Sequence, residues 1–175
     1  SGHSGISFYA DLPGDVKLAF AHVDDVDVTG FRAGISIGAW NGATGFTDVA
    51  ITNSDAHGNL QHGMIVYAQE RGGNAGVTVS HCRFFDNLGD RSATTPTGNG
   101  VVLGQVDGGL IERCVAWNNG GSGRAGLGPV AIWAYDSNAV TIEHCEAYGN
   151  HAAGSVDGGG FDLDIGMTNS LMQYD

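Results

Sequence analysis

A pattern that returns about every 30 residues is the feature that most constrains this fold. The segments Val77-Thr-Val-Ser-His-Cys82, Leu110-Ile-Glu-Arg-Cys114 and Val140-Thr-Ile-Glu-His-Cys145 share it, and Val49-Ala-Ile-Thr-Asn-Ser54 carries serine in the cysteine place. Extending the same register to 18–23 and to 169–174 gives six copies. Periods of roughly 20 to 50 residues are typical of proteins that stack one repeated unit.

Three columns of residues follow this repeat. An apolar column, which we expect to point inward, has spacings of 31, 28, 32, 31 and 29 residues. Its members are Phe20, Ile51, Val79, Ile111, Ile142 and Leu171. A column at an expected turn consists of Asn59, Asn87, Asn119 and Asn150, since asparagine tolerates left-handed backbone angles and can bond along a stack of like side chains. A third column, which opens strands with alternating apolar residues, consists of Gly5, Gly34, Gly63, Gly100, Pro129 and Gly160.

Apolar residues alternate with period two inside each copy, and Gly, Asn and Asp bound the apolar runs. A helical repeat would instead show spacings of three and four. A β-sandwich is the alternative, but it predicts hairpin signals without columns in register. The sequence therefore predicts an all-β parallel β-helix of about six coils with three strands per coil, in one domain spanning 1–175.

Composition supports many short strands joined by tight turns, with 30 glycines and only three prolines. The formal charge of −12 makes nucleic acid an unsuitable partner, because phosphate backbones require a basic footprint. No apolar run approaches the length of a membrane span, and 1–5 has none of the features of a signal peptide. Cations or neutral ligands fit this chain better.

Three cysteines, Cys82, Cys114 and Cys145, lie 32 and 31 residues apart. This spacing suits neither a disulfide framework nor a paired-cysteine metal site. Because it matches the repeat, we expect a row of buried, reduced thiols.

The arrangement of a Val-Thr-Ile-Glu-x-Cys strand, an asparagine turn and a Gly-initiated strand resembles the repeat of the pectin-lyase-like superfamily of right-handed parallel β-helices. The resemblance covers nearly the whole chain. It implies a secreted or periplasmic carbohydrate-active protein that binds a polysaccharide or oligosaccharide in a groove on the Gly-initiated strand face. The longest loops, such as 87–100 and 119–129, lie beside this face.

Alternation places Tyr9, Tyr67 and Trp133 on the outer side of the face, separated by glycines and about 10 Å apart. We predict that they bind sugar rings, together with Tyr135 and Arg124. An alternative is that aromatic residues simply suit half-buried strands. His57 and His62 flank Asn59 and could also face the groove.

Asp162 and Asp164 are the candidate catalytic pair, with side chains about 7 Å apart on one strand. Such a pair could act as acid and base in an inverting glycoside hydrolase, with His151 as a proton-transfer group. With Asp157, the same carboxylates could instead bind Ca²⁺. A solvated acidic strand is the remaining alternative.

The segment Gly160-Phe161-Asp162 resembles part of the alginate epimerase catalytic motif, which implies Asp162 as the catalytic aspartate. The flanking Tyr and Pro-His of that motif are absent, and no motif marks a basic residue of the kind pectate lyases use. A hydrolase is therefore favoured over a lyase or epimerase. The second candidate function is a non-catalytic glycan-binding, adhesion or structural module.

The last copy stops at Asp175, where the next turn and its asparagine should follow. We expect either further coils of a longer β-helix or end-to-end self-association through the last coil.

Overall fold

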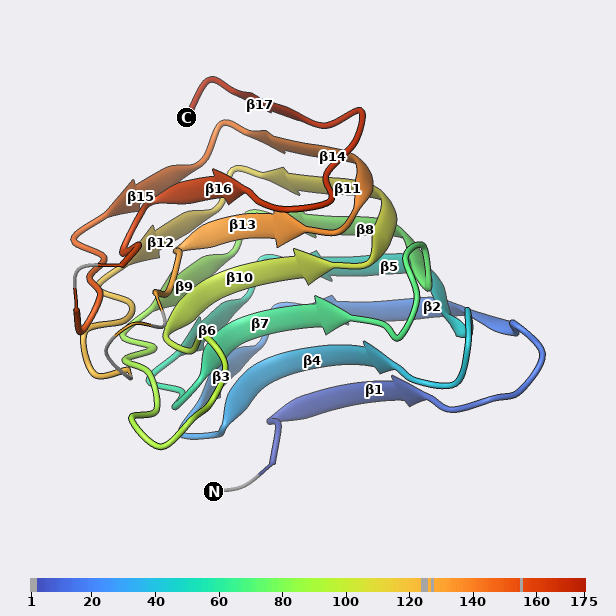
Figure 1. Ribbon diagram of the computed structural model, residues 1–175, viewed down its shortest axis with the longest axis horizontal. Coiled ribbons are helices and arrows are strands. Elements are labelled where there is room, and N and C mark those ends of the chain that lie inside the picture. Colours follow the sequence, from blue (N-terminus) through green and yellow to red (C-terminus); the bar gives the residue numbers. More distant parts are fainter. Residues whose placement is uncertain (1–2, 124–125, 127, 155) are drawn as a thin grey trace.

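The structure is a computed structural model that describes residues 3–123, 126, 128–154 and 156–175. All regular secondary structure within these residues is β-strand. The chain winds upward through successive coils, so that strands about one repeat apart lie side by side (Figure 1). This is the six-coil parallel β-helix predicted from the repeat.

Three parallel sheets form the sides of the β-helix, and every neighbouring pair of strands is parallel and in register. Sheet A consists of β1 (Ile6–Ala10), β4 (Ala33–Ala39), β7 (His62–Tyr67), β10 (Asn99–Gly104), β13 (Ile132–Tyr135) and β16 (Phe161–Leu163). Sheet B consists of β2 (Lys17–Asp24), β5 (Gly45–Thr52), β8 (Asn74–Ser80), β11 (Val106–Glu112), β14 (Asn138–Glu143) and β17 (Leu171–Gln173). Sheet C consists of β3 (Asp27–Thr29), β6 (Asp55–His57), β9 (Arg83–Phe85), β12 (Val115–Trp117) and β15 (Glu146–Tyr148).

The apolar column in sheet B forms the middle of the core, as predicted for four of its six members. Ile51, Val79, Ile111 and Ile142 are fully buried and pair in that order along the stack. The predictions for the first and last coils were wrong. Val23, not Phe20, pairs with Ile51, and Met172, not Leu171, pairs with Ile142.

Phe20 was misplaced because the first two coils are closer in sequence than the predicted column assumed: Val23 and Ile51 are 28 residues apart, whereas Phe20 and Ile51 are 31 apart. Phe20 has φ 66° and is 72% exposed, and the residues on either side of it pair with Thr47 and Val49. Left-handed angles recur at the same position of the next four coils, at Asp48, Gly76, Gly108 and Ala139. Phe20 therefore belongs to a feature shared by the coils, and the core residue lies three positions later.

The predicted strand-opening residue of the fifth coil in sheet A, Pro129, was wrong. Val101 pairs with Ile132, so Ala131 and not Pro129 lies above Gly100. Ile132 and Ala134 therefore face the core, and Trp133 and Tyr135 face outward. Gly100 and Ala131 are 31 residues apart, so the connection before β13 is two residues longer than the predicted column assumed.

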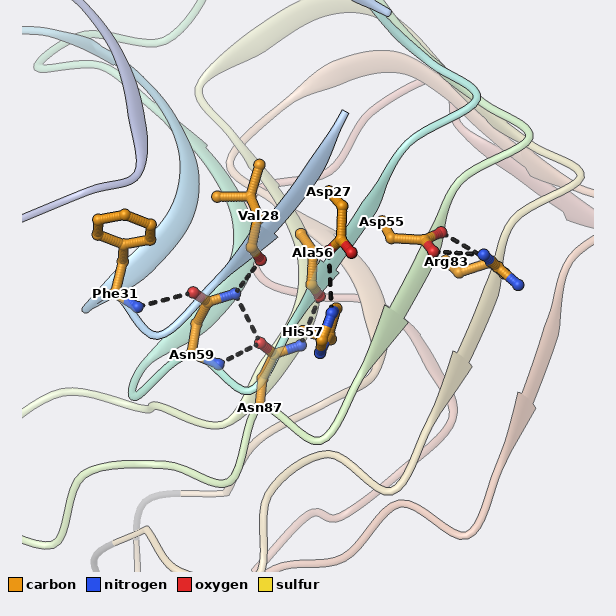
Figure 2. Close-up of polar contacts among 9 residues, drawn as sticks. All are labelled: Asp27, Val28, Phe31, Asp55, Ala56, His57, Asn59, Arg83 and Asn87. Carbon is orange, nitrogen blue, oxygen red and sulfur yellow. Dashed lines mark hydrogen bonds and ion pairs between the residues drawn. The ribbon is translucent and has the colours of Figure 1, made fainter. Parts of the chain in front are cut away.

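The asparagine column forms the predicted ladder at the turn between sheets C and A (Figure 2). Asn59 donates to Asn87 at 3.1 Å, Asn87 to Asn119 at 2.9 Å and Asn119 to Asn150 at 3.0 Å. Each side-chain oxygen also accepts the backbone N–H of the residue one coil below. The asparagines themselves lack left-handed angles. The residue before each one has them instead: Gly58, Asp86, Asn118 and Gly149.

The thiol row is confirmed. Cys82, Cys114 and Cys145 are free and buried, and stack above Ser54 on the inner side of the turn between sheets B and C. Each thiol donates to a backbone carbonyl of its own coil, as Cys114 does to Glu112 at 3.3 Å. Buried thiols in this arrangement fill space and satisfy carbonyl groups.

Asn87→Ala is expected to lower the free energy of unfolding by about 3 kcal/mol or more, measured by urea denaturation. The change leaves the N–H of Asn59 buried without a partner and removes the side-chain bonds to the Ala56 carbonyl and to Asn119. Asn138→Ala is the matched control, since its amide bonds lie at the surface, and it should cost about 1 kcal/mol or less. Equal losses in the two variants would contradict a structural role for the ladder.

Candidate functional site

A cleft of about 620 Å³ lies on the outer face of sheet A. Its floor is formed by outward side chains of β7, β10 and β13, and its walls by loops at both ends of these strands. The residues that line it are Trp40, His62, Ile65, Tyr67, Ala68, Gln69, Thr95, Pro96, Asn99, Val102, Gln105, Trp133 and Tyr135. The cleft therefore lies on the predicted face, and the long loop 87–100 contributes to one wall.

Two outward rows cross the face. The first is Ser7, Ser36, Ile65, Val102, Trp133 and Asp162, and the second is Tyr9, Gly38, Tyr67, Gly104, Tyr135 and Asp164. The sequence prediction placed Trp133 in the row of Tyr9 and Tyr67, which is wrong because of the shift in the fifth coil. Tyr135 takes that place instead. Trp133 and Tyr135 thus lie on one strand, with ring centroids 5.3 Å apart.

Tyr67 and Tyr135 each lie across a glycine of the coil below. A Cβ added to Gly38 would come within 2.4 Å of the Tyr67 hydroxyl, and one added to Gly104 within 2.4 Å of the Tyr135 ring. These glycines are needed because a side chain would displace the tyrosine rings. The alternation of aromatic residues and glycines seen in the sequence is therefore a packing requirement that fixes where the rings lie.

A chain of hydrogen bonds connects His62, Asn99 and Trp133 across three coils. The Asn99 side-chain oxygen accepts the Trp133 indole N–H at 3.0 Å and the Val130 backbone N–H at 2.9 Å. Both donors identify this atom as the oxygen, so the Asn99 amide nitrogen faces His62 Nδ1 at 3.0 Å. Nδ1 must accept this bond, and the proton of the neutral ring therefore lies on Nε2.

The His62 imidazole is neutral at physiological pH. Burial, and secondarily the charge of Arg32, lower the pKa of His62 from 6.5 to about 4. Protonation would also place an N–H on Nδ1 against the Asn99 amide group. Nε2 makes no hydrogen bond with any described residue, and no buried side-chain nitrogen or oxygen among those residues lacks a partner. It follows that Nε2 keeps some accessible surface, although His62 as a whole is 9% exposed, and that its N–H donor is directed toward the cleft that His62 lines.

A second hollow of about 480 Å³ adjoins the cleft toward β1. His62, Ile65 and Tyr67 line both, so the two form one groove along the axis of the β-helix. The second hollow is more polar and includes Ser7, Ser36 and the exposed Arg32. The combined groove crosses the strands of sheet A at right angles to their direction.

The predicted acidic pair lies beside the cleft but does not line it. Asp162 pairs with Trp133, and Asp164 follows at the end of β16. Partial burial, and then the nearby charges of Asp164 and Asp157, raise the pKa of Asp162. The Asp164 carboxylate accepts the Ile165 backbone N–H at 2.6 Å.

The remaining predicted residues are less closely connected to the cleft. Tyr9 is 54% exposed at the first coil, two coils below Tyr67. His151 is exposed and pairs through its backbone with Gly120, without a hydrogen bond from its ring to a described residue. Arg124 lies outside the described residues. Neither Asn99 nor Trp40 was identified from the sequence.

Within 3–123, 126, 128–154 and 156–175, no group of three or more His, Cys, Asp or Glu side chains is arranged to hold a metal ion. Asp157, Asp162 and Asp164 are therefore not assembled as a binding set, although their charges influence one another. Calcium binding there stays a prediction.

Sheet C also carries aromatic side chains on its outer face, but they are used differently. The rings of His57, Phe85, Trp117 and Tyr148 stack with centroid separations of 4.4, 4.3 and 5.9 Å and interplanar angles of 7° or less. Their faces cover one another, so the two inner rings, Phe85 and Trp117, lack a free face for a ligand. Asp27–His57 and Asp55–Arg83 pairs support the neighbouring coils beside this stack (Figure 2).

A family model described as "right handed beta helix region" matches residues 16–170. The chain belongs to this family, and the winding of its coils is right-handed. The pectin-lyase-like superfamily inferred from the repeat is consistent with this match. Neither the curated proteins nor the solved structures contain a significant match to the chain.

Across the described part of the chain, there is no helix with the length and apolar character needed to span a membrane.

We expect the free energy of unfolding to fall by about 3 kcal/mol as the pH drops from 6.5 to 4, because of His62. The pKa of His62 is lower in the folded protein than in the unfolded chain. Between pH 6.5 and 4, the unfolded chain therefore binds a proton at His62 and the folded protein does not. The stabilisation is complete above pH 6.5 and is lost as the pH falls toward 4. Urea denaturation across this range should show the slope.

The slope should be reduced in His62→Phe and retained in His22→Phe, which alters an exposed histidine on sheet B. An unchanged slope in His62→Phe would show that other groups cause it.

Proposed function

We propose that the protein binds a carbohydrate chain in the groove on sheet A. The observation that carries this proposal is the cleft itself, in which Tyr67, Trp133 and Tyr135 present aromatic rings beside hydrogen-bonding groups. Sugar rings have apolar C–H faces that pack on aromatic rings, and hydroxyl groups around their rims that need polar partners. Gln69, Gln105 and His62 supply such partners along the cleft.

The direction of the groove suits an extended ligand. It passes over successive coils from β1 toward β13, so one sugar unit after another would meet an equivalent strand. Rigid parallel strands hold the rings in place before binding. This pre-organisation reduces the entropy that the protein loses when it binds.

Glycoside hydrolysis is the second candidate function, and one observation favours it. Asp162 lies next to Trp133 on the adjacent strand, and its pKa is raised by partial burial and by neighbouring carboxylates. A general acid needs a raised pKa, and a second carboxylate, Asp164, lies two residues further along. Binding is the better-supported function, since neither carboxylate lines the cleft.

Trp133→Leu is expected to weaken binding of the best ligand on a glycan array by about tenfold or more, measured by calorimetry. The change removes one ring face and releases the hydrogen bond to Asn99. Trp117→Leu, on the stacked column of sheet C, is the matched control and should leave affinity unchanged. Equal losses in both variants would argue against the cleft as the binding site.

If the protein is a hydrolase, Asp162→Asn and Asp164→Asn should each abolish reducing-sugar release from a panel of polysaccharides. Thermal stability should change by about 1 kcal/mol or less, because both side chains lie on the outer face. Ligand affinity should persist in both variants. If the unmodified protein releases reducing sugar and both variants still release it, the two aspartates take no part in the mechanism.

A further inference from the structure

The cleft differs in charge from the rest of this acidic protein. Although the chain has a formal charge of −12, the described residues that line the cleft include no Asp, Glu, Lys or Arg. Among the described residues that line it, His62 is the only titratable group besides the tyrosines, and it is held neutral. A ligand group bound there therefore meets a neutral donor in an apolar setting.

The apolar setting comes from residues next to His62. Ile65 lies on the same strand, faces outward and is half-buried. Val102 occupies the neighbouring position on β10 and is 1% exposed, so only its edge reaches the cleft. Trp133 continues the same row on β13. A hydroxyl group placed on this row would lose water without gaining a partner, whereas a methyl group would be favoured.

The His62 ring is neutral, and the position of its proton on Nε2 is also fixed. Two donors hold the Asn99 oxygen, Asn99 holds His62 Nδ1, and the proton on Nε2 cannot move to Nδ1 without breaking this bond. Nε2–H therefore selects for a hydrogen-bond acceptor and against a donor. A carbonyl oxygen satisfies this requirement.

We propose that the cleft recognises a 2-acetamido sugar, with the acetamido carbonyl accepting from His62 Nε2–H and its methyl group packing on Ile65 and Val102. This proposal rests on the proposed carbohydrate binding and specifies its ligand class. His62 is then a specificity-determining residue. Trp133, oriented by the same Asn99 side chain, packs on the face of the sugar ring.

A carboxylate is the competing acceptor, because Arg32 lies in the adjoining hollow. The apolar row disfavours it, since a carboxylate on Ile65 and Val102 would lose hydration that one donor cannot replace. An acetamido group carries no charge and brings its own apolar part. The apolar row therefore favours the neutral acetamido group over a carboxylate.

Calorimetry with three tetrasaccharides of equal length tests the proposal. The probes are the β-1,4-linked tetramers of N-acetylglucosamine and of glucose, which differ only at C2, and tetragalacturonate as the anionic probe. We expect the acetylated tetramer to bind at least tenfold more tightly than either of the others. His62→Phe and Ile65→Ser should each reduce this preference to about threefold or less, and His22→Phe should retain it.

The outcomes separate the two levels of the proposal. Equal binding of the two neutral tetramers, or a preference for tetragalacturonate, would overturn the acetamido assignment and leave carbohydrate binding intact. If none of the three probes binds and a wider glycan array is also negative, the proposed function fails and the assignment fails with it.

A ligand-free measurement on the unmodified protein keeps the assignment testable if His62→Phe does not fold. The ¹⁵N chemical shifts of the His62 ring should show the Nε2–H tautomer at pH 7. A ring protonated on Nδ1 would overturn the proposal, because Nε2 would then be an acceptor.

Discussion

Hydrogen bonding between equivalent residues of successive coils is the interaction on which the whole structure depends. Each coil can bond to its neighbour only if its corners repeat the backbone angles of the coil below. One such corner consists of residues that all have left-handed angles, although none is glycine: Asp25, Asn53, His81, Arg113, His144 and Tyr174. A left-handed angle costs such a residue about 1 to 2 kcal/mol. The stack tolerates this cost because the strands on either side fix the corner.

The repeat predicted the fold because each coil buries residues at equivalent positions, so similar residues recur there in the sequence. The asparagine column, the cysteine row and the central Ile and Val residues were all predictable, since each depends on a neighbour one repeat away in the sequence. Errors occurred where spacing was not constant. Phe20 was misplaced because paired residues of the first two coils are 28 and not 31 positions apart, and Pro129 because paired residues of β10 and β13 are 31 and not 29 positions apart. Neither change alters composition or alternation enough to be visible in a single sequence.

The candidate site was predictable only in part, for a related reason. The aromatic face could be read from alternation, and Tyr67 and Tyr135 do lie there beside glycines that they need. His62 and Asn99 are register partners, but the long loop between β9 and β10 places them 37 positions apart. The Asn99–Trp133 bond runs diagonally over 34 positions, whereas paired residues of β10 and β13 are 31 apart. Asn99 connects to His62 one coil below and to Trp133 one coil above through two different atoms of its side chain. A pattern of columns contains no information about such diagonal contacts.

The two aromatic faces of the β-helix show how one residue type serves two purposes. On sheet C, rings occur in consecutive coils and stack on each other, so neighbouring rings cover their faces. On sheet A, glycines separate the tyrosines in their row, and Tyr67 and Tyr135 lie over the glycines of the coils below and line the cleft. The spacing of rings along the axis, rather than their number, therefore decides whether a face of this β-helix stabilises the stack or can bind a ligand.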